Sequence, residues 1–249
     1  MIDSPQHTKL TQDLEKLSTL YRLKAYGYEY LEDDVLAKLF DTQNSQNQLS
    51  LKVPEDYDGL KDFVHNCTLC EFSKSKKHTI FGSDYHGKST NQPIKIMFVG
   101  DFAGAIEDES GDIFAGKSSQ TLINMITKVL NLDLKEIYYT NILKCRPPIN
   151  KTPNADEVST CIKYLHTQIK IIKPLLIVAL GEFSFAHLDS QNLDFKQIRG
   201  NKIKYNFEDI EIDMVATFHP GFFTRNPSAK KDAMQDLAII KSIINTKAN

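Results

Sequence analysis

Short apolar runs alternate with amphipathic stretches through most of the chain, and this pattern predicts strands alternating with helices. Four runs have the length and composition of buried strands, at residues 94–99, 138–143, 175–180 and 210–218. Apolar residues at helical spacing follow three of them, at 122–129, 158–172 and 233–244. This alternation is typical of a parallel sheet covered by helices on both faces. We therefore predict an α/β fold of three layers (α/β/α) around a central four-stranded parallel sheet.

The N-terminal part of the chain has a different pattern. Residues 8–40 carry apolar positions at helical spacing, and residues 41–50 (DTQNSQNQLS) have the polar composition of a linker. We therefore expect an N-terminal helical extension with its linker at 1–50 and a main domain at 51–249. The extension is either an additional structural layer or an element that docks a partner or regulates, and its partner is unknown.

Hydropathy and charge restrict which cell compartment and which partners we expect. The longest apolar runs, IMFV and LLIVAL, are too short to cross a bilayer, and no secretory leader opens the sequence. We therefore expect a cytoplasmic protein without membrane association. The formal net charge of −2 gives no global signal for nucleic acid, although binding needs only a local basic patch.

Three groups of basic residues are candidates for such a patch; an ordinary solvated face is the favoured interpretation of the first two, and the third is the strongest candidate. They are Lys74, Lys76, Lys77 and His78; Arg225, Lys230 and Lys231; and Lys144, Arg146 and Lys151.

The chain has four cysteines, at Cys67, Cys70, Cys145 and Cys161. In a reducing cytoplasm they are metal ligands or buried residues rather than disulfides. Four thiolates can bind zinc or an iron–sulfur cluster. A C-x2-C pair, a long gap and then C-x15-C is not a compact zinc-finger spacing, but ligand type alone does not separate the two metals.

Unusual residues mark the carboxyl ends of the four predicted strands, namely Gly100, Asn141, Gly181 and His219. In parallel α/β sheets the ligand site lies beyond these ends. Asn141 offers both a donor and an acceptor, as a carbonyl-and-imide edge requires. Taken alone, an Asn at a strand end is more often a turn residue, and the same holds for a His-Pro.

The order of the motifs carries more information than any one of them. V-G-D-F-A-G-A-I-E-D-E-S-G-D-I-F-A-G (99–116), Y-T-N-I-L-K-C-R-P-P (139–148), I-V-A-L-G (177–181) and H-P-G-F-F-T-R-N-P (219–227) follow C-T-L-C (67–70). Together they resemble the family 4 uracil-DNA glycosylases, the iron–sulfur members of that superfamily. The resemblance covers roughly residues 57 to 244.

That resemblance implies a set of ligands and site residues. The four cysteines match the ligands of a [4Fe–4S] cluster that orders DNA-contacting loops. Phe114 matches the aromatic that stacks on the flipped uracil, Asn141 the residue that binds the uracil edge, and His219 the one that supports charge on O2. Phe222 or Phe223 matches the wedge inserted into the base stack. The remaining expected substrate contacts are Gly100, Phe102, Gly104 and Arg225.

The first motif departs from the family pattern. Where the family reads G-E-A-P-G, this chain reads Gly100-Asp101-Phe102-Ala103-Gly104, with a shorter carboxylate, a bulky ring and no proline. Glu107 matches a later acidic position. The residue that orients the water is therefore either Asp101 or Glu107.

The activity that the resemblance implies is base-excision repair of uracil-containing DNA by a monomeric hydrolase. The motifs contain no obvious lysine nucleophile, so we expect excision without strand cleavage. The alternatives are a catalytically weak or inactive DNA-binding iron–sulfur protein and a glycosylase with altered base specificity, since Phe102 changes the pocket wall.

Overall fold

A computed structural model describes residues 53–86 and 93–247, apart from the side chains of Thr224 and Arg225. The chain from Pro54 onward forms one compact unit. The helices expected in 8–40 and the linker at 41–50 lie outside the described residues, so the extension stays a prediction.

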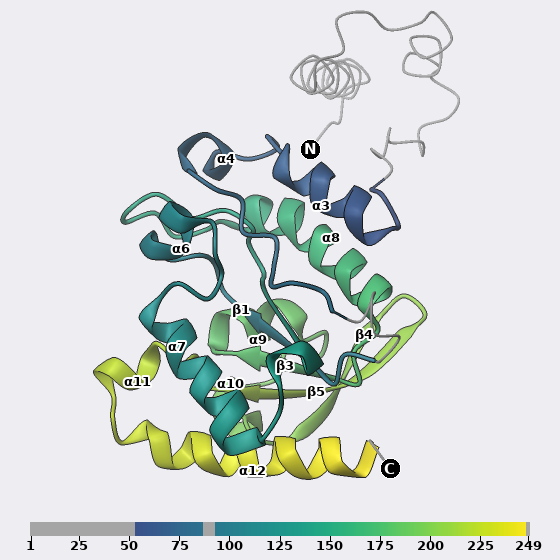
Figure 1. Cartoon of the computed structure of the whole chain (residues 1–249), viewed down its shortest axis with the longest axis vertical. Helices are drawn as coiled ribbons and strands as arrows, with labels where there is room; N and C mark the ends of the chain where they lie inside the picture. Colours follow the sequence, from purple (N-terminus) through teal and green to yellow (C-terminus); the bar gives the residue numbers. More distant parts are fainter. Residues whose placement is uncertain (1–52, 87–92, 248–249) are drawn as a thin grey trace, which may run out of the picture. The chain divides into compact units, whose positions relative to one another are not determined.

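The centre of this unit is a five-stranded sheet in the order β2-β1-β3-β5-β4 (Figure 1). The four predicted strands are β1 (Ile96–Gly100), β2 (Ile137–Asn141), β3 (Leu176–Leu180) and β5 (Ile210–Thr217), and they pair in parallel. The α/β class is confirmed.

The expectation of four strands is corrected by one additional edge strand, β4 (Lys202–Phe207), which pairs antiparallel with β5. Of its six residues only Tyr205 is buried. A search for apolar runs does not find such a strand, because an edge strand packs one face and leaves polar side chains on the other.

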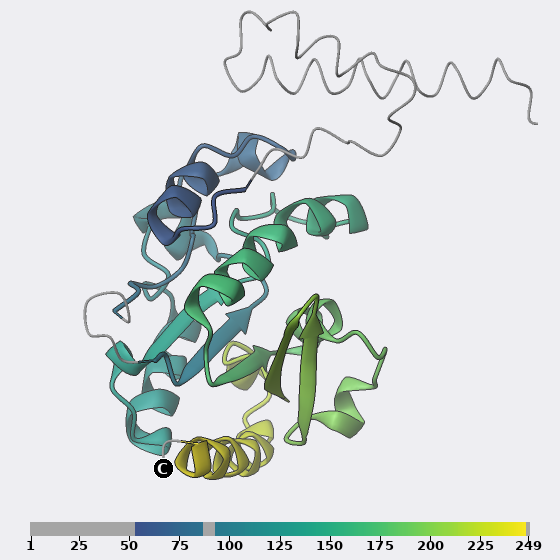
Figure 2. The ribbon, with the colours of Figure 1, turned by 90° about the vertical axis from the view of Figure 1, so that its right-hand side faces the viewer.

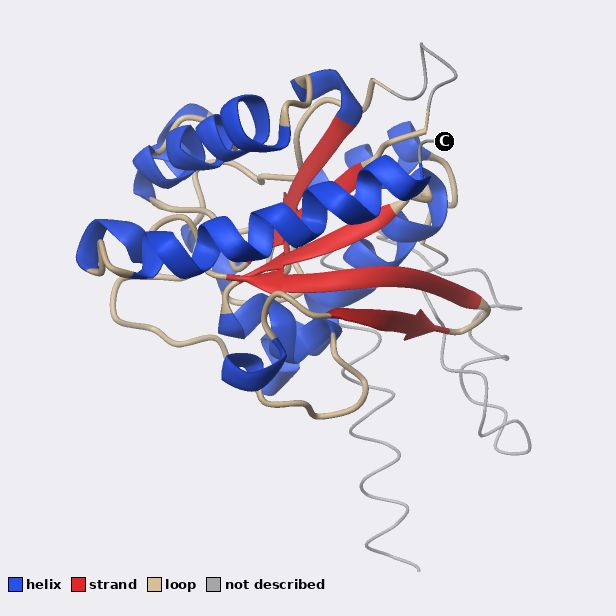
Figure 3. Ribbon diagram, turned by 90° about the horizontal axis from the view of Figure 1, so that it is seen from below, coloured by secondary structure: helices blue, strands red, loops and turns tan. Residues whose placement is uncertain are grey.

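Helices cover both faces of the sheet (Figures 2 and 3). One face carries α7 (Lys117–Asn124), the π-helix η1 (Met125–Leu130) and α12 (Ala229–Lys247), whose apolar side chains form one buried cluster with those of the strands. The opposite face carries α8 (Ala155–Ile172), with α3 (Tyr57–His65) packed on it. These are the three expected layers.

The remaining helices are short and lie in the connections. They are α4 (Phe72–Ser75), α6 (Ala105–Ser110), η2 (Leu134–Glu136), α9 (Glu182–Leu188), α10 (Phe195–Ile198) and α11 (Phe222–Arg225). Among the described residues, no helix combines the length and apolar character that crossing a membrane needs.

Helix α8 begins at Ala155, two residues after Pro153. Asn154 is the N-cap: its Oδ1 accepts from the Glu157 amide at 2.9 Å, and the Glu157 carboxylate accepts from the Asn154 amide at 3.0 Å. This reciprocal capping box satisfies two donors that a helix start otherwise leaves open. It places Cys161 on the buried side of the second turn.

Strand β1 lies between β2 and β3, so the connections leave it in opposite directions. In open α/β sheets, this switch point opens a crevice at the carboxyl ends of the strands. Gly100 ends β1 directly opposite Asn141 at the end of β2. The candidate residues at the strand ends therefore meet at one edge of the sheet.

Candidate functional site

Asn141 lies at the centre of this edge with an unused acceptor. Its side chain is 2% exposed, and its Oδ1 has no hydrogen-bond partner among the described residues. A buried unpaired acceptor costs about 1–3 kcal/mol, so one in a native fold calls for an explanation. A ligand N–H placed against Asn141 would remove that cost.

Gly100 gives Asn141 the space it occupies. A Cβ on Gly100 would lie 2.5 Å from Asn141 Oδ1 and 3.1 Å from the Tyr139 hydroxyl. Any side chain at this position would displace one of them, so the glycine is required by close approach.

Tyr139 and Phe114 form an aromatic wall beside Asn141. Their ring centroids are 5.7 Å apart with the planes tilted by 40°. Burial raises the pKa of the Tyr139 phenol, and the nearby carboxylates of Glu107 and Asp101 raise it further. The phenol is therefore neutral, and it is hydrogen-bonded to Ser119. Sequence reasoning missed Tyr139, although a residue two before Asn141 on a strand lies on the same face.

Asp101 is held on two sides. Its carbonyl accepts from the Leu143 amide at 3.0 Å, and its Oδ1 accepts from the Ser184 amide at 3.1 Å. Burial raises the pKa of the Asp101 carboxyl to about 7, against the opposing effect of the Ser184 N–H. Near neutral pH this carboxyl is present in both protonation states, as a general base requires.

Gly181 brings Asp101 and His219 together. Its φ is +94°, a conformation that residues with a side chain rarely adopt. A Cβ there would lie 3.1 Å from the His219 Cβ and 3.9 Å from Asp101 Oδ1. The carboxylate and the imidazole thus flank the same glycine.

The tautomer of His219 follows from its own turn. Its Nδ1 accepts from the Gly221 amide at 3.1 Å, which leaves the ring proton of the neutral imidazole on Nε2. A Cβ on Gly221 would lie 2.7 Å from the Ser118 hydroxyl and 3.2 Å from this Nδ1, so the turn is closely packed. Nε2 can therefore act as a hydrogen-bond donor.

Glu107 lies in a different part of the site from Asp101. Its carboxylate packs against Gly104 and Gly116, where a Cβ on Gly104 would lie 2.5 Å from Oε2. Gly116 is the N-cap of α7, and a carboxylate is favoured at the positive end of a helix. This location gives Glu107 a role in holding the loop between α6 and α7.

The loop after His219 distinguishes the two wedge candidates. Phe223 is 6% exposed and belongs to the buried core. Phe222 is only partly buried and stacks on Phe218, with ring centroids 5.2 Å apart and an interplanar angle of 11°. The Arg199 guanidinium also lies over the Phe218 ring, 4.8 Å from its centroid. The side chain of Arg225 lies outside the described residues.

Phe102 lies at the rim of the crevice beyond the strand ends. It is 40% exposed and contacts the Phe183 ring edge to face, with centroids 6.1 Å apart. Because Asp101 binds the Ser184 amide, the two aromatic residues flank that hydrogen bond.

The four cysteines gather at one corner. Cys67, Cys145 and Cys161 are buried and Cys70 is partly exposed. The Cys145 thiol interacts electrostatically with the other three, and burial is the main reason that its pKa is raised to about 12. The amide of Lys144 donates to Cys161 Sγ at 3.3 Å, and Cys67 Sγ lies 3.2 Å from the Tyr164 hydroxyl.

Four thiolates at one corner can hold either a zinc ion or an iron–sulfur cluster. Four thiolates around one zinc ion lie within about 3.8 Å of one another, given Zn–S bonds of about 2.3 Å. In the described part of the chain, no three His, Cys, Asp or Glu side chains converge closely enough for one ion. Cysteine thiolates are also the usual ligands of iron–sulfur clusters.

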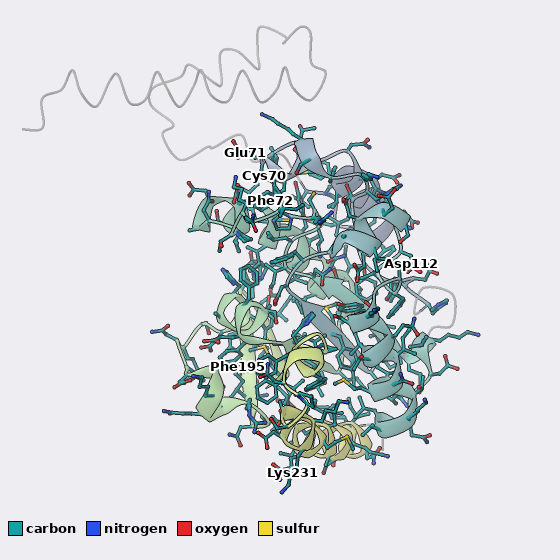
Figure 4. All side chains as sticks on the ribbon, turned by 90° about the vertical axis from the view of Figure 1, so that its left-hand side faces the viewer. Cys70, Glu71, Phe72, Asp112, Phe195 and Lys231 are labelled. Carbon is teal, nitrogen blue, oxygen red and sulfur yellow. The ribbon has the colours of Figure 1, made fainter. Side chains whose placement is uncertain are left out.

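The candidate basic patches are separated in space. Figure 4 shows Cys70, Glu71 and Phe72 at one end and Lys231 at the other, so the first two groups do not form one surface. Lys144, proposed from sequence as a DNA contact, is 1% exposed, and this expectation is corrected: a buried ammonium cannot reach DNA. Lys151 pairs with Glu157 at 2.8 Å and with Glu71 at 2.5 Å.

Comparisons with known proteins agree with this architecture. The family model of the uracil DNA glycosylase superfamily matches residues 88–241. The type-4 uracil-DNA glycosylase of Sulfurisphaera tokodaii is 31% identical over 191 residues, covering 75% of this chain and 84% of the relative. The enzyme of the same name from Saccharolobus solfataricus is 31% identical over 197 residues (78% and 88%), and that of Thermotoga maritima 30% over 184 residues (73% and 91%).

The chain therefore belongs to the uracil DNA glycosylase superfamily, in its type-4 branch.

Proposed function

We propose that this protein excises uracil from DNA by hydrolysing the N-glycosidic bond, as a monofunctional repair glycosylase. The observation that carries the proposal is the buried, unpaired Oδ1 of Asn141 at the carboxyl end of β2. The type-4 names of the relatives support it independently.

Recognition begins with a base taken out of the duplex, which costs a few kcal/mol of unstacking. Asn141 Oδ1 accepts the N3–H of uracil, and the amide group of the same side chain can donate to O4. Phe114, next to Tyr139, provides the aromatic face on which the base stacks. The amides of the turn between Gly100 and Gly104 are further donors.

Bond cleavage leaves negative charge on the departing base and positive charge on the sugar. His219 donates from Nε2 to uracil O2, a type of preorganised interaction whose removal costs on the order of 10²–10³ in kcat. Asp101 orients the attacking water and accepts its proton. The C1′–N1 bond breaks, the water oxygen bonds to C1′, and uracil leaves as the anion.

The choice of Asp101 over Glu107 is supported by position. Asp101 Oδ1 and His219 flank Gly181, whereas the Glu107 carboxylate packs against Gly104 and Gly116. An elevated pKa near 7 also suits a base that accepts a proton near neutral pH.

We further propose that Cys67, Cys70, Cys145 and Cys161 hold a [4Fe–4S] cluster. When bound, the cluster supplies a structural cross-link between the loop at Cys67–Cys70 and the loop between β2 and α8. No step of the hydrolysis passes through it. The four free thiols are also consistent with a reducing cytoplasm, where we place the protein as a monomer.

DNA contacts come from the rim of the crevice. We assign the wedge to Phe222, because Phe223 is committed to the core. Apolar wedges of this kind insert between base steps and kink the duplex. Phe102, exposed at the rim, and Arg225 complete the proposed substrate contacts.

The direct test is base release from a uracil-containing oligonucleotide by the purified, cluster-loaded protein. Alkali should cleave the product, whereas untreated DNA should stay intact because excision leaves an abasic site. Activity no greater than that of Asn141→Ala would contradict the proposal. Parallel substrates with thymine, hypoxanthine or xanthine distinguish altered base specificity, and tight binding without release would identify an inactive binding protein.

A further inference from the structure

Lys144 is a buried lysine whose three side-chain hydrogen bonds all go to neutral oxygens. Its Nζ donates to Thr140 Oγ1 at 2.6 Å, to the Asn141 carbonyl at 2.8 Å and to Gln168 Oε1 at 2.6 Å. An ammonium group has three protons, so its donor capacity is fully used. Burying a charge is costly unless it is compensated, so this arrangement requires precise surroundings.

Those surroundings are rigid. Gln168 is fully buried, and its Nε2 donates to the Phe81 carbonyl and to the Tyr138 hydroxyl, each at 2.9 Å. Thr140 Oγ1 donates to the same Phe81 carbonyl at 2.8 Å. The ammonium of Lys144 is therefore held by α8 and β2 together, in a network with little freedom to adjust.

Lys144 also joins the two halves of the site. Its amide donates to Cys161 Sγ, and the next residue is Cys145. Its side chain reaches back to the main chain of Asn141. Thr140, which Lys144 contacts, faces α8, whereas Asn141 alternates with it and faces the pocket. The side chain of Lys144 therefore binds the carbonyl of Asn141 from the face of the sheet opposite the pocket.

The main chain of Lys144 connects this network to the cysteine corner, because its amide donates to Cys161 Sγ at 3.3 Å and the next residue is Cys145. The network around Lys144 therefore depends on both the cysteines and the strand end.

We propose that Lys144 is a positioning residue for base excision, which fixes the main chain of Asn141 and thereby couples the pocket geometry to the ligation of Cys145 and Cys161. The inference rests on the proposed function, because Asn141 must be the residue that binds the base. The cysteine corner then has two roles: it orders the loops, and it aligns Asn141.

Lys144→Met tests this, because it keeps the length of the side chain and removes its three donors. We expect the single-turnover rate of uracil release to fall on the order of 10²-fold, since misplacing a binding group by about 1 Å has an effect of this size. Affinity for DNA containing an abasic site should stay within about twofold to threefold, because Lys144 does not reach the surface. Lys163→Met, which removes an exposed lysine from α8, is the matched control and should behave like the wild type.

Amide hydrogen exchange gives a readout that does not need activity. The amides of Ile142 and Leu143 bond to the Gly100 and Asp101 carbonyls at 2.9 and 3.0 Å, directly after Asn141. Lys144→Met should accelerate exchange at these two amides, and removing iron from the wild type should do the same. In Lys144→Met, iron removal should cause little further acceleration of exchange at these amides, because the connection between the cysteines and Asn141 is already lost.

Each outcome decides one of the two proposals. If the wild type releases no uracil, the proposed function fails, and accelerated exchange at residues 142 and 143 still supports the positioning role. A folded Lys144→Met protein with wild-type excision and unchanged exchange overturns the inference, as does a parallel loss of DNA affinity. Should Lys144→Met not fold, Thr140→Val removes one of the three acceptors, and a normal rate and exchange in that variant count against the inference.

Discussion

The side-chain oxygen of Asn141 lies against Gly100, 2.5 Å from the point where a Cβ would stand. The two residues end neighbouring strands and are paired in register. The orientation of the amide is therefore set by the absence of a side chain on the adjacent strand, which makes Gly100 part of the recognition site.

Gly100→Ala should lower uracil release on the order of a hundredfold, because the new methyl group displaces Asn141 or the Tyr139 hydroxyl. Far-ultraviolet circular dichroism should be unchanged, since φ at this glycine is not in the left-handed region. Ala186→Gly, at an exposed position of α9, is the control for a general loss of stability. Normal excision by Gly100→Ala would show that Asn141 is not held as described.

Asp101 should give the reaction its pH dependence. Because the pKa of its carboxyl is raised to about 7, the base form accumulates as pH rises, and excision should increase through that pH. Asp101→Asn should abolish this limb of the single-turnover profile, whereas Glu107→Gln should keep it. A profile whose limb disappears in Glu107→Gln would reassign the role.

Raising the pH should increase the rate of excision but lower the contribution of the same Asp101 carboxyl to the free energy of unfolding. Between the ordinary pKa of 3.8 and about 7, folded Asp101 holds a proton that the unfolded chain has released. Its contribution to the free energy of unfolding is therefore full below pH 3.8 and is lost as pH rises through about 7. Thermal melts should show Asp101→Asn gaining stability relative to the wild type between pH 4 and pH 8 (roughly the same window). A constant difference across that range would contradict the raised pKa.

His219→Ala should lower the rate of base release by about 10²–10³ while leaving the affinity for abasic-site DNA nearly intact, since the Nε2 donor acts on charge that develops during cleavage. Equal losses of rate and affinity would indicate a binding role for His219 instead.

Substitutions of the two phenylalanines after His219 should have different effects. Phe222→Ala is expected to slow excision from duplex DNA more than from single strands, because a wedge is needed only where bases are stacked. Phe223→Ala removes a core side chain and should destabilise the fold by about 3–5 kcal/mol. Comparing rates on both substrates with melting temperatures tests this, and an equal effect of Phe222→Ala on both substrates would remove the wedge assignment.

Anaerobically prepared protein should be brown, with the broad visible absorbance of an iron–sulfur cluster. Cys145→Ala should lose that absorbance and melt at a lower temperature, because the loop between β2 and α8 loses its cross-link. Iron and zinc analysis of both proteins is the measurement. A colourless wild type with stoichiometric zinc would overturn the assignment.

The sequence predicts the ends of β1 and β3 well, because these buried strands are apolar runs that stop at Gly100 and Gly181, whereas β2 ends at Asn141, two residues before the predicted end at 143. It does not predict β4, whose identity depends on pairing with β5 rather than on its own pattern. The expectation that Lys144 contacts DNA was wrong for a similar reason. Its burial follows from acceptors on β2 and α8, and no local pattern shows that these oxygens converge.

The site residues also fall into two groups, those that the sequence indicates and those that only the folded structure brings together. Asn141 and His219 were proposed from their positions at predicted strand ends, and Asp101, with Glu107 as the alternative, from its place in the first family motif. Tyr139, Ser118 and Ser184 become visible only when segments distant in the sequence are packed together.

The unpaired oxygen of Asn141 also has a consequence for discrimination between bases. Uracil carries a hydrogen at N3, whereas cytosine, the base from which uracil arises by deamination, carries a lone pair there. With Asn141 Oδ1 confined against Gly100, cytosine would place one acceptor against another, and both would stay unsatisfied in a buried site. Sites built around such a hydrogen bond reject the analogue that lacks it by large factors. The atom that is left without a partner in the protein is thus also the one that would protect undamaged DNA.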